Sequence, residues 1–289
     1  MINRQRALIR LISNEGGCIT KLRLVKLSFL LQATAQKLPR PSLYEFVPYH
    51  HGPYSFTLTH ELRAVERDGW IRISDSEVNL LRNADAETSK LGLGVAKEID
   101  RLSRRYQNVT TSKLVSSVYS EYPWYTAKAK NPSLRRTEVP IAQPTIFTVG
   151  YEGLMLDGLL DLLLRNGVKR LIDVRRNPVA RRFGFHKSTM QRHCDDVGIA
   201  YNHVPELGVP SEQRTDLDDA KSYDRLFDYY EKAILPAQQA ALKSVSSMIQ
   251  QEPSALMCME ALVACCHRGR LAAAVAKMTN LKVKELRIS

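Results

Sequence analysis

The second half of the chain alternates between short apolar strands and amphipathic helices, and this alternation restricts its fold more than any other feature. The strands are expected at 145–149, 170–174, 200–204, 254–259 and 283–288. The helices between them are expected at 154–166, 189–197, 223–251 (broken near Pro236) and 267–278. Strands that are joined through helices run parallel, and a parallel sheet is covered by helices on both faces. The pattern therefore predicts a three-layer α/β/α, Rossmann-like domain with a mostly parallel sheet over residues 144–289.

The first half shows helical spacing followed by a short β segment. Its main helices are expected at 6–13, 21–36 and 55–68, with strands at 43–49 and 70–73 and further helices at 87–107 and 112–119. Three helices followed by a strand is the order of a winged helix-turn-helix. We therefore predict a mostly helical winged-helix DNA-binding domain over 1–125. Residues 126–143 lack periodicity and contain two prolines, as is typical of a linker.

Positive charge is concentrated in the first half. The 289 residues carry a formal charge of +12, and residues 1–140 hold 22 Lys and Arg against 13 Asp and Glu, a net +9. Such an excess favours a polyanionic partner, DNA above all, because each neutralised phosphate releases counterions. A basic protein without any such partner is the alternative. No apolar run reaches the ~20 residues of a membrane span, and the odd number of cysteines, five, predicts reduced thiols and a cytoplasmic location.

Polar residues follow the strands of the second half at the ends where ligands bind in open parallel sheets. We expect these segments to meet at one edge and to form a cleft. The candidate catalytic residues are Asp173, Glu260, Cys266 and His267. The candidate substrate-binding residues are Gly150, Tyr151, Glu152, Arg175, Pro178, Arg181, Cys258 and Arg268.

Cys266 and His267 lie where a helix begins. The helix dipole and neighbouring cations favour a thiolate there, which makes Cys266 a candidate nucleophile and His267 a candidate acid or base. A purely binding role or simple packing is the alternative for this thiol. Glu260 is a candidate base or ligand-binding group, and its alternative is an ion pair with a nearby arginine. Asp173 either binds substrate or caps the loop that follows its strand.

A basic segment could contact nucleic acid directly. Residues 165–192 hold nine Lys and Arg and one acidic residue, with two phenylalanines among them. Arginines beside aromatic rings suit phosphate contact and base stacking, although a solvated basic loop would have the same composition. The candidate nucleic-acid-binding residues are Lys21, Arg23, Lys26, His50, His51, Arg182, Phe183 and Lys187.

The sequence offers no motif for a resident cofactor. There is no C-x-x-C pair and no H-E-x-x-H, so the spacing of the cysteines and histidines does not favour zinc or another metal. A P-loop and a G-x-G-x-x-G are also missing, so neither a nucleoside triphosphate nor a dinucleotide is indicated.

Four ordered motifs of the second half resemble the domain of unknown function 488 family. They are TIFTVGYEG, LIDVRRNPVARRFGF, GIAYNHVPELG, and the pair CME and CCHR, within residues 145–289. The resemblance implies a three-layer α/β domain but no settled reaction. The polar residues that it implies are Gly150, Tyr151, Asp173, Arg175, Pro178, Arg181, Cys258, Glu260, Cys266, His267 and Arg268. The apolar ALVAC after Glu260 departs from the more polar turn of that family.

The first half resembles winged-helix domains related to the Panacea antitoxin group. The resemblance lies in RLVKLSFLL, FVPYHHGPYS and VYSEYPWY, and it implies contact with DNA or with a toxin.

Three functional hypotheses follow. In the first, the chain is an enzyme of DNA or nucleotide processing in repair or defence, performing hydrolysis, base removal or group transfer. In the second, it is a non-catalytic DNA-binding sensor or regulator that binds a small nucleotide or a modified base in the cleft. In the third, it is an antitoxin-like module that binds a protein partner.

Overall fold

A computed structural model describes residues 1–34, 43–213 and 220–287. The chain divides into two compact units, Met1–Glu138 and Val139–Ser289, and the division lies inside the segment 126–143 for which the sequence predicts a linker. Thr126 and Ala129 at the start of that segment are nevertheless buried, so the first unit extends beyond residue 125.

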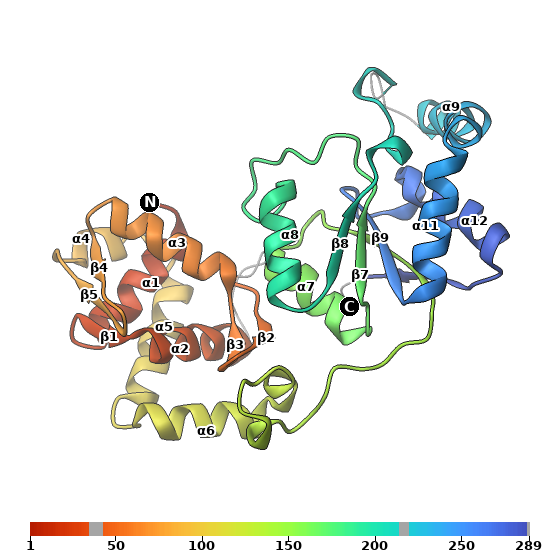
Figure 1. Cartoon of the computed structure of the whole chain (residues 1–289). Helices are drawn as coiled ribbons and strands as arrows, with labels where there is room; N and C mark the ends of the chain where they lie inside the picture. The colour runs from red at the N-terminus through yellow and green to blue at the C-terminus, as the bar shows by residue number, and fades with distance from the viewer. Residues whose placement is uncertain (35–42, 214–219, 288–289) are drawn as a thin grey trace. The chain divides into compact units, whose positions relative to one another are not determined.

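The first unit is mostly helical and contains a small antiparallel sheet (Figure 1). Its strands pair in the order β1-β5-β4, and β2 and β3 form a separate hairpin. Its elements are α1 (Asn3–Asn14), β1 (Cys18–Thr20), α2 (Lys21–Thr34), β2 (Val47–Tyr49), β3 (Gly52–Tyr54), α3 (Phe56–Arg67), β4 (Ile71–Ile73), β5 (Glu77–Leu80), α4 (Asp85–Thr88), α5 (Leu93–Tyr106), α6 (Thr111–Glu121) and the 3-10 helices η1 (Pro123–Thr126) and η2 (Pro132–Leu134).

Local chemistry explains where these elements begin and end. Ser55 caps α3 by accepting a hydrogen bond from the Leu58 amide, and Gly69 leaves the helix at a φ of +70°. The helix expected at 87–107 is instead two helices, α4 and α5, and Gly92 lies in the gap between them. The strand expected from residue 43 begins only at Val47, and residues 35–36 of the second expected helix lie outside the described residues.

The second unit is a parallel α/β domain. All five strands are parallel and pair in the order β10-β6-β9-β7-β8. Its elements are β6 (Ile146–Gly150), α7 (Leu156–Arg165), β7 (Arg170–Asp173), α8 (Lys187–Asp196), β8 (Ala200–His203), the 3-10 helices η3 (Pro205–Leu207) and η4 (Ser211–Gln213), α9 (Ala220–Tyr229), the π-helix η5 (Tyr230–Ile234), α10 (Leu235–Ala237), α11 (Gln239–Gln251), β9 (Ser254–Cys258), the 3-10 helix η6 (Val263–Cys265), α12 (His267–Thr279) and β10 (Val283–Leu286).

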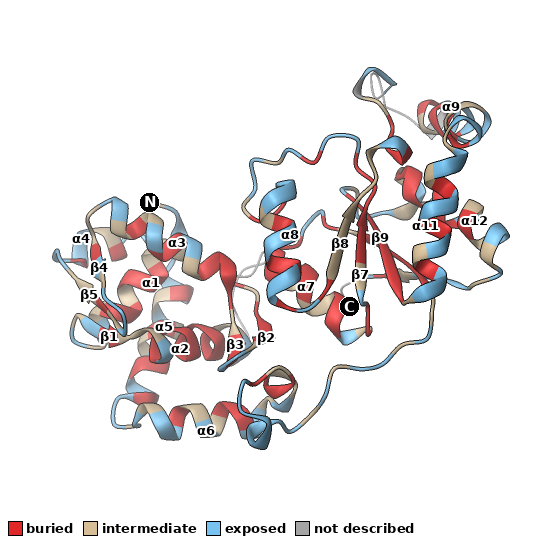
Figure 2. Ribbon diagram, in the orientation of Figure 1, coloured by how far each residue is buried: buried red, intermediate tan, exposed pale blue. Residues whose placement is uncertain are grey.

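The sheet lies between two layers of helices, as the sequence predicts. α7 and α8 lie on one side of the sheet, and α11 and α12 lie on the other (Figure 1). The central strands β6, β7 and β9 are almost wholly buried, and most of their residues are apolar (Figure 2). Within the described residues, no helix is both long and apolar enough to cross a membrane.

Two positively charged side chains of α2 take part in contacts within the first unit. The Lys26 side chain is 1 % exposed, and its ammonium donates a hydrogen bond to the Pro53 carbonyl oxygen at 3.0 Å. Arg23 pairs with Glu15 and also donates to the carbonyl oxygens of Val109 and Tyr106. These partners place both groups inside the first unit. The expectation that Arg23 and Lys26 contact nucleic acid therefore does not fit the structure.

Burial of Lys26 makes stability depend on pH. Burial lowers the pKa of its ammonium from 10.5 to about 7, so unfolding takes up a proton between these two values. Wild-type stability should therefore rise as pH rises from about 7 to about 10, and Lys26→Met should lack this rise. At pH 6 the variant should be more stable by roughly 1–4 kcal/mol. Chemical denaturation across this pH range measures both effects, and Lys97→Met on the exposed side of α5 is the control. Parallel curves of stability against pH for the wild type and Lys26→Met would contradict the prediction.

Candidate functional site

The carboxyl ends of β6, β9 and β7 meet at one edge of the sheet. The Tyr151 amide donates to the Cys258 carbonyl oxygen at 3.3 Å, and the Val174 amide donates to that of Met257 at 3.1 Å. The loops that follow these three strands therefore begin side by side, because adjacent parallel strands end at the same edge. The expected candidate residues thus gather at one edge.

The pleat of the sheet divides these residues between two faces. Ile172, Val174 and Cys258 belong to the core that packs against α11 and α12. Because side chains alternate along a strand, Asp173 points to the opposite face, which α7 and α8 cover. The structure therefore separates Asp173 from Cys258, Cys266 and His267, although the sequence places all of them in one cleft.

Asp173 is fully buried in a network of its own. Its two carboxylate oxygens accept from the Arg175 guanidinium at 2.8 and 2.5 Å, and the Tyr201 hydroxyl donates to it at 2.6 Å. Arg175 also donates to the Tyr151 hydroxyl and to the Phe185 carbonyl oxygen, and the Tyr151 and Phe185 rings stack at 4.2 Å. The Asp173 carboxylate raises the pKa of Arg175, even though burial opposes this change.

This network corrects the roles expected for two residues. A carboxylate that accepts a two-pronged ion pair and a tyrosine hydroxyl has little capacity left for substrate. The guanidinium of Arg175 is likewise satisfied by protein groups. We therefore assign Asp173 and Arg175 to the architecture of the loop after β7, and not to catalysis or substrate binding.

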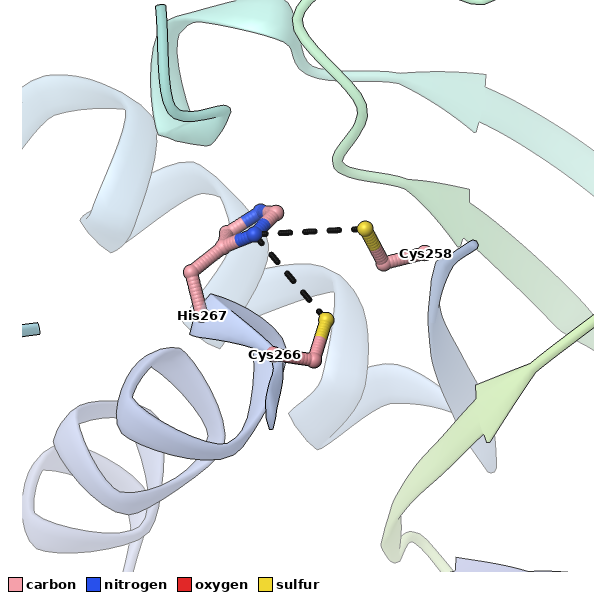
Figure 3. A group of neighbouring side chains, drawn as sticks. All are labelled: Cys258, Cys266 and His267. Atoms are coloured by element: carbon pink, nitrogen blue, oxygen red, sulfur yellow. Dashed lines mark hydrogen bonds between the residues drawn. The ribbon is translucent and has the colours of Figure 1, made fainter. Parts of the chain in front are cut away.

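On the other face, Cys258, Cys266 and His267 form a compact group that we call the sulfur–imidazole cluster (Figure 3). The two Sγ atoms lie 3.9 Å and 4.0 Å from His267 Nδ1. The side chains are 0 %, 2 % and 2 % exposed, respectively. Cys258 is the last residue of β9 and Cys266 is the N-cap of α12. The cluster is thus held by two regular elements.

The orientation of the His267 ring is fixed by its other nitrogen. Nε2 lies 3.2 Å from the carbonyl oxygen of Val174. A carbonyl oxygen only accepts, so Nε2 carries the hydrogen and the lone pair of a neutral ring is on Nδ1. The buried Tyr230 ring packs edge-on against the imidazole at 5.3 Å, and its hydroxyl donates to the Leu207 carbonyl oxygen. The Nδ1 lone pair therefore faces the two sulfurs.

Glu260 adds a carboxylate to the edge of the cluster. Its Oε2 accepts from the Cys258 thiol at 3.1 Å, and its side chain is only partly buried. Arg268 is 0 % exposed and donates to the carbonyl oxygens of Glu260 and Ala261, and Glu152 accepts from the Ala261 amide. Arg268 and Glu152 therefore hold the loop that carries Glu260 instead of projecting toward a substrate.

Gly150 lets this loop pass close to β6. A Cβ atom at Gly150 would lie 1.8 Å from the Glu260 carbonyl oxygen, so no side chain fits there. The expected substrate-binding role of Gly150 is thus replaced by a steric one that keeps Glu260 beside Cys258.

The cluster changes the proton affinities of its members. A hydrogen bond from Cys266 holds the pKa of Cys258 well below its usual range, with help from His267. Burial raises the pKa of Cys266 and also that of Glu260. Ionisation of one sulfur thus disfavours ionisation of the other, and burial acts against the Cys266 thiolate that the sequence favours.

The loop after β7 exposes a set of cations. Pro178 is buried within the loop, and Phe183 lies 5.9 Å from the His193 ring. The Arg182 guanidinium lies over the Phe185 ring at 5.4 Å. Between residues 174 and 187 the chain has no acidic residue, and its exposed cations are Arg176, Arg181, Arg182 and Lys187.

In the first unit, the remaining candidates lie near the surface. Lys21 begins α2 half-buried, His50 stacks on Tyr49 at 4.1 Å, and His51 is exposed at the turn of the β2–β3 hairpin. Arg63 and Arg67 are exposed on α3 and are not among the residues predicted from the sequence. Their i, i+4 spacing in the third helix was the signal that could have identified them.

Residues 155–275 match the family model described as Domain of unknown function DUF488. The match covers the second unit from α7 to α12 and includes Cys258, Glu260, Cys266 and His267, so the resemblance expected for this half is confirmed. No curated protein and no solved structure matches the chain.

The Asp173 network predicts a loss of stability on substitution. Asp173→Asn leaves the buried Arg175 guanidinium without its carboxylate and should lower the free energy of unfolding by about 3 kcal/mol or more. Tyr201→Phe removes one hydrogen bond and should cost about 1 kcal/mol. Equilibrium denaturation measures both changes. If both variants lost equally little free energy of unfolding, the Asp173–Arg175 ion pair would not have a structural role.

Proposed function

We propose that the protein binds DNA through its first unit and acts on a nucleic-acid or nucleotide substrate beside the sulfur–imidazole cluster. The observation that carries the proposal is the pairing of a partly exposed carboxylate, Glu260, with two thiols and an imidazole at the carboxyl edge of a parallel sheet. The loop after the neighbouring strand supplies exposed cations and no acidic residue. This combination suits a polyanionic substrate whose reacting group needs proton transfer.

The first unit supports DNA binding through the order of its elements. The order α1, β1, α2, α3, β4, β5 is that of a winged helix, with the β2–β3 hairpin added between α2 and α3 and the other three strands in one antiparallel sheet. In that arrangement α3 takes the position of the recognition helix, and Arg63 and Arg67 lie on its exposed side. The β4–β5 hairpin takes the position of the wing.

DNA affinity should depend on the exposed arginines of α3. Arg63→Ala combined with Arg67→Ala should weaken binding to duplex DNA about tenfold or more, because two cations that contact phosphates or bases are lost. The slope of log affinity against log salt should fall by about 2. Fluorescence anisotropy over a salt series measures both quantities.

A charge-matched control is available in the same unit. Lys97 on α5 and Lys113 on α6 are also exposed, and the double variant Lys97→Ala, Lys113→Ala removes the same charge. Equal losses in the two double variants would mean that binding reflects net charge alone and would remove α3 from the interface.

In the second unit, Glu260 is the group best placed to transfer a proton. Solvent reaches Glu260, whereas the two thiols and the imidazole are buried. Burial raises the pKa of its carboxyl, which brings the group closer to the range in which a carboxylate serves as general acid or base. Hydrolysis, base removal and group transfer all need such a group.

Substitution of Glu260 separates turnover from binding. Glu260→Gln should lower turnover by about 10²-fold or more, because a general acid or base typically contributes 10²–10⁴-fold, while DNA affinity stays unchanged. Product formation is measured with single-stranded and duplex DNA, RNA and nucleotides, and affinity by anisotropy. Glu206→Gln on η3 is the exposed control, because its carboxylate lies outside the loop that carries Glu260. A wild-type protein that alters none of these substrates would contradict the enzymatic part.

The burial of the sulfur–imidazole cluster favours one second candidate. A DNA-binding regulator that holds a small nucleotide or modified base near Glu260 would need no exposed nucleophile. In that case ligand would shift the affinity for DNA while no product formed, and the same two measurements would show it.

A further inference from the structure

We propose that Cys258, Cys266 and His267 bind a zinc ion, with two thiolates and one imidazole as its protein ligands. This inference concerns the metal and stands independently of DNA binding. If the enzymatic proposal also holds, it identifies the chemistry of the same site as metal-assisted hydrolysis.

The donor atoms have the identity and spacing that zinc needs. Zinc in proteins prefers sulfur at about 2.3 Å and nitrogen at about 2.0 Å in tetrahedral geometry, which places the sulfur and nitrogen atoms about 3.6 Å apart. The two Sγ atoms lie 3.9 Å and 4.0 Å from Nδ1, and all three donors lie within 4.8 Å of one another. Shifts of a few tenths of an ångström would bring each sulfur to the sulfur–nitrogen separation of a zinc site. Two thiolates also balance the charge of one Zn²⁺ ion.

The imidazole is oriented as in metal sites. A histidine that binds a metal through one nitrogen almost always donates its other ring N–H to a carboxylate, carbonyl or water. His267 has this arrangement, because Nε2 donates to the Val174 carbonyl oxygen and Nδ1 faces the sulfurs (Figure 3). The edge of Tyr230 restrains the ring further. A ring held in this way presents Nδ1 without a cost in side-chain entropy when metal binds.

The two flanking elements are also rigid enough to preorganise the ligands. Cys258 ends a central strand that is paired on both sides, and Cys266 and His267 begin the 13-residue helix α12. Arg268 joins the two segments by donating to the carbonyl oxygens of Glu260 and Ala261. The ligand set therefore does not depend on a mobile loop.

Three protein ligands leave the fourth tetrahedral position for water or substrate, the pattern of catalytic zinc sites. Glu260 lies beside this set, with its Oε2 at 3.1 Å from the sulfur of Cys258. A zinc-bound water would pass its proton to Glu260, the resulting hydroxide would bond to the electrophilic atom of the substrate, and Glu260 would return the proton to the leaving group as its bond breaks. No oxidant or reductant is needed.

The sequence spacing does not favour this site because its two cysteines belong to different elements, one at the end of β9 and one at the start of α12. Cys258 and Cys266 are separated by the loop 259–262 and by η6, so no C-x-x-C pair arises. Cys265, the neighbour of Cys266, is half-buried and is not among the three donors. The pair of adjacent cysteines thus contains one ligand and one matched control.

Zinc binding is tested directly on the full chain. Protein depleted of metal is titrated with zinc against a chromogenic chelator, and metal content is measured after dialysis by mass spectrometry. We expect one zinc per chain for the wild type, for Cys265→Ser and for Glu260→Gln. Cys258→Ser, Cys266→Ser and His267→Ala should each lose at least tenfold in zinc affinity. Circular dichroism verifies that each variant is folded.

Cobalt substitution provides a readout that reports the ligands themselves. Cobalt bound by two thiolates gives sulfur-to-metal charge-transfer absorption, which should weaken in Cys258→Ser and in Cys266→Ser and persist in Cys265→Ser. The proposal would be overturned if the wild-type protein failed to take zinc from the chelator. It would also be overturned if the cysteine variants kept the zinc affinity and the cobalt spectrum of the wild type. Zinc binding without any turnover would contradict only the enzymatic function, and turnover without zinc would contradict only the metal site.

Discussion

The hydrogen bond from His267 Nε2 to the Val174 carbonyl oxygen is the contact on which the candidate site depends. It joins the first residue of α12 to the residue that follows β7, and it decides which ring nitrogen has the lone pair. With Nε2 occupied by this hydrogen bond, Nδ1 is the nitrogen left to face the sulfurs of Cys258 and Cys266. The chemistry of Cys258 and Cys266 thus depends on the backbone carbonyl of Val174, which follows the neighbouring strand β7.

Much of this arrangement follows from the sequence because the relevant distances along the chain are short. Cys258 and Glu260 are two residues apart at the end of an apolar strand, and Cys266 and His267 begin a helix with a clear start. The alternation of strands and helices places such segments at one edge of a parallel sheet. The fold class and the gathering of Cys258, Glu260, Cys266 and His267 could therefore be predicted.

What could not be predicted depends on the order of strands and on burial. The insertion of β9 between β6 and β7 brings Val174 next to Met257, and no local pattern encodes that pairing. The alternation along β7 sends Asp173 to the α7–α8 face, where Arg175 and, from the neighbouring strand β8, Tyr201 satisfy it. The local helical sequence around Lys26 does not reveal that this side chain is buried, yet the packing of the β2–β3 hairpin covers it. Long-range packing decides in each case whether a polar residue faces solvent.

The two polar networks of the second unit differ in how completely their polar groups are paired. This difference distinguishes a structural role from a functional one. In the Asp173 network each strong donor meets a strong acceptor, so the charges cancel internally and nothing is left to bind. In the sulfur–imidazole cluster, two sulfur atoms face one ring nitrogen at distances near 4 Å, and the Cys258 thiol donates to a carboxylate beside them. Metal ligands that bond only weakly to one another are stabilised most by an added cation. The cation replaces their poor contacts by coordinate bonds and leaves the surrounding core undisturbed.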